Sequence, residues 1–92
     1  MNPNFCKFVF PANVSPDLLE GLVGLAVLKA ERIFGRARTR IYASYTLART
    51  PPCCVIDTSS KVGRFVAEAF VALALQFTGG DFTVVRLDKW EP

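Results

Sequence analysis

The sequence contains no histidine, and this absence excludes several classes of functional site. Histidine is the commonest general base and transition-metal ligand, and it completes Ser-His and Cys-His catalytic pairs. We therefore expect no catalytic residue of the usual kinds, no metal site and no cofactor. A small enzyme that works on an anionic substrate at Ser59 to Arg64 is kept as the enzymatic alternative.

Long apolar runs are also absent. No stretch of about 18 uncharged apolar residues occurs, so the sequence predicts no membrane span. The first four residues, Met-Asn-Pro-Asn, lack the basic start of a secretory signal. With three cysteines, an odd number, a reducing compartment is more plausible than a disulfide framework. We expect a cytoplasmic protein.

The adjacent pair Cys53-Cys54 does not have the spacing of a redox or metal-binding motif. Neighbouring side chains in a strand point to opposite faces, which prevents both thiols from binding one ion. We expect both cysteines to behave as small buried hydrophobic residues, and we expect Cys6 to lie away from them.

Apolar residues make up 51% of the 92 residues, and the mean hydropathy is positive. A chain of this length forms one domain, here residues 1–92, and a small domain hides only part of its apolar surface. The high proportion of apolar residues therefore favours either a dense core or an apolar surface covered by another copy of the chain.

The order of elements is read from hydrophobic periodicity and from residues that end helices and strands. Ser15 and Pro16 are typical of a helix start, and Gly35 is typical of a helix end. The pattern predicts strands at 5–10, 36–48, 53–57 and 81–87, helices at 16–34 and 61–77, and a polar tail at 88–92.

This order predicts an α+β fold with four antiparallel strands and two helices on one face of the sheet, the ferredoxin-like βαββαβ arrangement. In that arrangement the first and third strands are central. The segments 5–10 and 53–57 are the most apolar of the four, which agrees with central positions.

Both predicted helices carry more large apolar residues than one stripe against a sheet can accommodate. Each such residue that moves from water into a contact contributes about 1.5–3 kcal/mol before ordering costs. We expect a homo-oligomer, such as a symmetric dimer. The candidate self-association residues are Leu18, Leu25, Leu28, Val66 and Phe70.

The segment from Val55 to Arg64 predicts a strand that leads through a hydroxyl-rich turn into a helix. A helix start offers free N–H groups, and two nearby cations would add to the attraction of an anion. The candidate anion-binding residues are Ser59, Ser60, Lys61 and Arg64. The alternative is ordinary capping of the helix, with both cations in water.

A second candidate surface follows from the alternation of Arg36, Arg38 and Arg40. In a strand these side chains share one face, with Tyr42 next along the chain and Lys7 on a neighbouring strand. Cations interleaved with aromatic rings are typical of single-stranded nucleic-acid binding. Phe82 or Arg86 would share the same face. The alternative is a solvated edge strand whose arginines prevent aggregation.

Charge is unevenly distributed along the chain. The net charge is +3, but residues 29–64 carry eight basic and two acidic side chains, a local charge of +6. This asymmetry suits either an acidic partner or head-to-tail attraction between subunits. Besides a second copy of the chain, the candidate partners are an acidic partner protein, a small anion or RNA. The leading interpretation is a non-enzymatic oligomeric module that acts through protein association or a small anionic ligand, with RNA binding as the main alternative.

Overall fold

The computed structural model describes residues 4–87, so the polar tail predicted for residues 88–92 lies outside the described part of the chain. Along the chain the elements are β1 (Phe5–Val9), α1 (Pro16–Phe34), α2 (Arg36–Tyr42), β2 (Tyr45–Arg49), β3 (Pro52–Asp57), α3 (Lys61–Thr78) and β4 (Thr83–Leu87). The predicted α+β class is confirmed.

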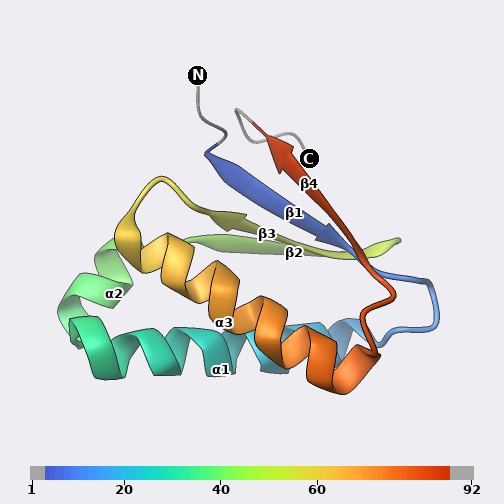
Figure 1. Cartoon of the computed structure of the whole chain (residues 1–92), viewed down its shortest axis with the longest axis horizontal. Helices are drawn as coiled ribbons and strands as arrows, with labels where there is room; N and C mark the ends of the chain where they lie inside the picture. The colour runs from blue at the N-terminus through green and yellow to red at the C-terminus, as the bar shows by residue number, and fades with distance from the viewer. Residues whose placement is uncertain (1–3, 88–92) are drawn as a thin grey trace.

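The four strands form one antiparallel sheet in the order β2-β3-β1-β4. The first and third strands occupy the centre, as their apolar sequences predicted. The two long helices, α1 and α3, lie side by side on one face of the sheet (Figure 1). The opposite face, here called the open face, carries no helix among the described residues (Figure 1).

Both long helices begin and end where local sequence signals predicted. Pro16 occupies the first turn of α1, and Gly35 ends that helix with φ +86°, a backbone conformation that favours glycine. Ser60 caps α3 by accepting a hydrogen bond from the Gly63 N–H at 2.9 Å. Ser15, the N-cap residue of α1, makes no side-chain hydrogen bond to the helix, in contrast to the capping expected of a serine at a helix start.

The predicted strand at residues 36–48 is wrong in its first half. Arg36–Tyr42 forms helix α2, and strand β2 begins only at Tyr45. Arginine and alanine favour helices, and charge alternation is not specific to strands. Thr39 is fully buried in α2, which packs against both α1 and α3, so tertiary contacts reinforce the helical conformation.

The core lies between the sheet and the two long helices. Phe8 of β1 packs against Phe70 of α3 with 5.2 Å between ring centroids, and Phe10 stacks on Phe82 at 4.8 Å. From α1 the core takes Leu19, Leu22, Val23, Ala26 and Ala30. Dense packing of this kind makes each core side chain sensitive to a change in volume.

The outward faces of the helices keep exposed apolar residues. Leu25 and Leu28 of α1 are 47% and 56% exposed, and Leu75 of α3 is also exposed. Between residues 4 and 87, no helix combines the length and the apolar character needed to cross a membrane.

Candidate anion-binding cleft

The turn between β3 and α3 holds the hydroxyl groups of the predicted anion site, but most of them have internal partners. The Asp57 carboxylate accepts hydrogen bonds from the Ser59 N–H at 2.9 Å and from the Ser59 hydroxyl at 2.7 Å. The Ser60 hydroxyl accepts the Gly63 N–H. Ordinary capping, the alternative weighed from the sequence, therefore describes Ser60.

Backbone hydrogen bonds fix this turn against the sheet. The Thr58 N–H donates to the Asn4 carbonyl at 2.7 Å, and the Asp57 N–H donates to the Ser44 carbonyl at 2.9 Å. Because the turn is held from both sides, the start of α3 has a fixed position beside the beginning of β1. Arg64, in the first turns of α3, therefore also lies near the beginning of β1.

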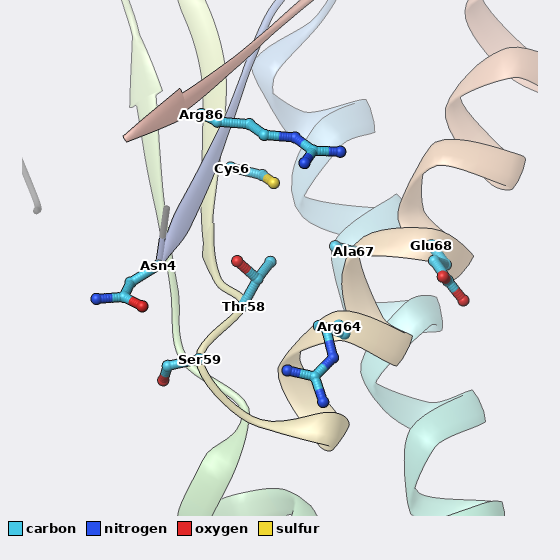
Figure 2. A pocket seen from close by; sticks show the side chains of 8 residues that line it. All are labelled: Asn4, Cys6, Thr58, Ser59, Arg64, Ala67, Glu68 and Arg86. Carbon is cyan, nitrogen blue, oxygen red and sulfur yellow. The ribbon is translucent and has the colours of Figure 1, made fainter. Parts of the chain in front are cut away.

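Beside this turn lies a cleft of about 400 Å³, bounded by β1, β4, the turn and α3 (Figure 2). Its lining residues are Asn4, Cys6, Thr58, Ser59, Arg64, Ala67, Glu68 and Arg86. Of the four predicted anion-site residues, Ser59 and Arg64 line the cleft. Lys61 is exposed and, like Ser60, is not among the lining residues.

Helical spacing explains the α3 wall of the cleft. Residues three or four positions apart lie on the same side of a helix, and Arg64, Ala67 and Glu68 follow that spacing. The sheet wall follows from strand pairing. Cys6 pairs with Arg86 of β4, so both side chains point to the side of the sheet that carries the helices.

Arg86 was expected on the same face as Lys7, and this expectation is wrong. Lys7 pairs with Val55 and with Val85, which places it on the open face, whereas Arg86 lies one position further along β4 and points to the opposite side. Phe82 also lies on the helix side, where it stacks on Phe10. In Figure 2 the Arg86 side chain extends from β4 towards α3.

The cleft has a net positive rim. Arg64 and Arg86 contribute two guanidinium groups, and Glu68 contributes one carboxylate. Within residues 4–87 the ion pair present is Arg49 with Asp17, at 3.4 Å on the surface, so neither cleft arginine is paired with a carboxylate in that part of the chain.

Sequence reasoning missed Asn4, Cys6, Glu68 and Arg86 as members of this site. A usable signal existed for Arg86, because the predicted order places the last strand beside the first. In the structure this neighbouring pair of strands places Arg86 opposite Cys6. The register itself, however, is fixed only by packing of the sheet against the helices.

The nucleic-acid candidates are not brought together on one face. Arg36, Arg38, Arg40 and Tyr42 lie on α2, while Lys7 lies on the open face of the sheet. In a helix Arg38 points away from the side shared by Arg36 and Arg40. The Arg38 guanidinium instead lies 5.2 Å from the centroid of the Phe34 ring. The proposed strand face for nucleic acid does not exist in this fold.

The self-association candidates divide into two groups. Val66 and Phe70 are buried in the core of the single chain, so their assignment to an outer surface is wrong. The side of α3 that carries them is covered by the sheet. Leu25 and Leu28 are exposed on α1, and Leu18 is partly buried beside them.

The adjacent cysteines lie in the interior of the sheet. Cys53 and Cys54 are both buried, and Cys54 belongs to the core. Burial, with the neighbouring Cys53 as a lesser cause, raises the pKa of Cys54 to about 12. That thiol therefore stays protonated and unreactive. In the described residues no group of three or more possible ligands is arranged to hold a metal ion.

Comparisons with protein-family models, curated proteins and solved structures find no match to this chain.

Proposed function

We propose that this chain is a non-enzymatic binding module that holds a small anionic ligand, through a carboxylate or phosphate group, in the cleft between Arg64 and Arg86. The observation that carries the proposal is the convergence of two arginines, 22 positions apart in the sequence, on one cavity of about 400 Å³. Guanidinium groups bind such anions through paired, charge-assisted hydrogen bonds.

The other lining residues fit a ligand that carries hydrogen-bonding groups beside its charge. Asn4, Thr58 and Ser59 bring an amide and two hydroxyl groups to the same cavity. Glu68 would repel a second negative charge and would accept a hydrogen bond from a ligand hydroxyl or amine. The chain has no histidine to act as a base, which supports binding without chemistry.

For the architecture we propose a ferredoxin-like arrangement with one additional helix. The central positions of β1 and β3 and the placement of α1 and α3 on one face support it. Helix α2, between α1 and β2, is the addition. We place the protein in the reducing environment of the cytoplasm, as supported by its three free cysteines.

The direct test is isothermal titration calorimetry of the full chain with inorganic phosphate. We expect saturable binding that weakens about 10-fold to 100-fold in Arg64→Ala and in Arg86→Ala, since hydrogen bonds to charged groups contribute about 1.5–3 kcal/mol. Lys61→Ala is the matched control, because Lys61 begins the same helix outside the cleft.

The control variant distinguishes a cleft from general attraction to basic protein. Loss of a surface charge that does not touch the ligand changes affinity by less than about threefold. If Lys61→Ala weakened phosphate binding as much as Arg86→Ala, or if the unaltered chain bound no phosphate, the cleft proposal would be wrong.

The exposed leucines of α1 support a second proposal, a homo-oligomer. Leu25 and Leu28 lie on the outer face of α1 at 47% and 56% exposure. Covering both would contribute about 3 kcal/mol before ordering costs. We expect light scattering to show a mass above that of one chain, and the double variant Leu25→Gln with Leu28→Gln to reduce it.

Ile41→Gln is the control for this second proposal. Ile41 is also exposed and large, but it lies on α2 rather than on the outer face of α1. We expect its substitution to leave the mass unchanged. A monomeric unaltered chain at high micromolar concentration would contradict self-association.

A further inference from the structure

The anion cleft continues into a second, apolar cavity under the edge strand β4. This cavity has a volume of about 290 Å³ and is lined by Cys6, Phe8, Ala67, Glu68, Val71, Val84 and Arg86. Cys6, Ala67, Glu68 and Arg86 line both cavities. The two spaces therefore form one groove between α3 and β4, charged at one end and apolar at the other.

The apolar end exists because β4 extends beyond the area that the helices cover. Phe8 and Val84 pair across β1 and β4 and share one face of the sheet. Phe8 is 2% exposed, whereas Val84 is 49% exposed. Helix α3 covers the central strand and leaves the edge strand uncovered, so Val84 forms an open apolar wall opposite Val71 of α3.

From this arrangement we infer that the ligand is amphipathic: its anionic head lies between Arg64 and Arg86, and a short apolar chain or ring lies along Phe8, Val71 and Val84. The inference rests on the proposed anion-binding function and names the class of ligand. A simple inorganic anion would fill only the polar end of the groove.

The size and the charge of the groove favour a small free amphiphile as its occupant. The apolar end has a volume of about 290 Å³, and it shares Arg86 with the charged end of the groove. A strand or helix of a partner protein would bury far more area than this groove offers. A ligand with one charged end and one apolar end matches both cavities at once.

The test is calorimetric titration of the full chain with ethyl, butyl, hexyl and octyl phosphate below their micelle-forming concentrations. Affinity should rise with chain length by about twofold to fourfold for each added methylene group that is buried. Inorganic phosphate gives the contribution of the head group alone.

Two substitutions on one strand provide a matched pair. Val84→Thr places a hydroxyl in the apolar wall while keeping a β-branched residue of similar shape. It should flatten the dependence on chain length and leave the affinity for inorganic phosphate unchanged. Val85→Thr changes a residue that is 43% exposed on the open face, and it should leave both quantities unchanged.

The outcomes separate this inference from the function on which it rests. Phosphate binding without any dependence on chain length would overturn the inference and leave the anion cleft intact, whereas no binding of any probe would overturn both. Equal effects of Val84→Thr and Val85→Thr would also overturn the inference. The inference would also be wrong if the chain sedimented with phosphatidylglycerol vesicles but did not bind octyl phosphate. It would be wrong as well if a change of oligomer mass were the only effect of Val84→Thr.

Discussion

Arg86 of β4 lies directly opposite Cys6 of β1, and this pairing places the Arg86 side chain on the helix side of the sheet. The same cavity is lined by Arg64, which belongs to the first turns of α3. A shift of one residue in the β1–β4 register would move Arg86 to the open face. The candidate site therefore depends on strand register as much as on residue type.

Gly63 allows α3 to approach the end of β3 closely, so Gly63→Ala should destabilise the fold. A methyl group at this position would overlap the carbonyl oxygen of Asp57, which is backbone and cannot move aside. We expect the free energy of unfolding, measured by urea denaturation, to fall by more than about 2 kcal/mol.

Gly21→Ala is the control for that loss. Gly21 lies in α1 with no atom near the position of an added methyl group, and alanine favours helices over glycine by about 0.8–1 kcal/mol. This variant should be slightly more stable than the unaltered chain. A Gly63→Ala variant as stable as Gly21→Ala would contradict the close contact.

The two serines that precede the long helices should differ in their effect on stability. The Ser60 hydroxyl accepts the Gly63 N–H, and its replacement by alanine should lower the free energy of unfolding by about 1 kcal/mol. Ser15 makes no such bond, so Ser15→Ala should change stability by less than about 0.5 kcal/mol. If denaturant titrations showed the same loss of unfolding free energy in Ser60→Ala and in Ser15→Ala, the capping assignments would be wrong.

Thr39→Val should stabilise the protein. The Thr39 side chain is fully buried, and its hydroxyl oxygen has no hydrogen-bond partner within residues 4–87. An unsatisfied buried polar group costs about 1–3 kcal/mol, and valine keeps the shape without the hydroxyl. Thermal unfolding should show a higher midpoint for this variant.

Thr78→Val serves as the control for Thr39→Val. The Thr78 hydroxyl donates to the Ala74 carbonyl at 2.7 Å, so its removal should lower stability by about 1 kcal/mol. A loss of stability in Thr39→Val as large as in Thr78→Val would mean that the buried hydroxyl is hydrogen-bonded in solution.

Alkaline pH should weaken the fold through Cys54. Its pKa is raised from 9.0 to about 12 by burial, so above pH 9 the unfolded chain loses this proton while the folded chain keeps it. Stability then falls as pH rises from about 9 to about 12, by at most about 1.4 kcal/mol per pH unit from this group. In Cys54→Ala the free energy of unfolding, measured by urea denaturation at each pH, should fall less steeply as the pH rises across that range. The same pH dependence in the variant and in the unaltered chain would exclude Cys54 as a cause.

Much of the fold could be predicted from the sequence, because its signals are local. Pro16 and Gly35 mark both ends of α1, and the apolar runs at 5–10 and 53–57 indicated the two central strands. Helix α2 could not be predicted from alternation alone. Its conformation depends on the burial of Thr39 against two other helices, which is a tertiary effect.

The candidate site was predicted only in part, for a physical reason. Ser59 and Arg64 follow β3 directly and were found from the local turn, whereas Arg86 joins them through the pairing of the first and last strands. Val66 and Phe70 were predicted to lie on a self-association surface, because a helical pattern does not show how much of a helix its neighbours cover. Here both residues lie in the core.

The most direct test of the central claim is a phosphate titration of the isotopically labelled chain followed by amide NMR shifts. The cleft predicts saturable shifts that concentrate at Thr58, Ser59, Arg64 and Arg86, with little change along α2 at residues 36–42. Shifts that are as large on α2 as in the cleft, or that rise without saturation, would contradict a specific anion site at Arg64 and Arg86.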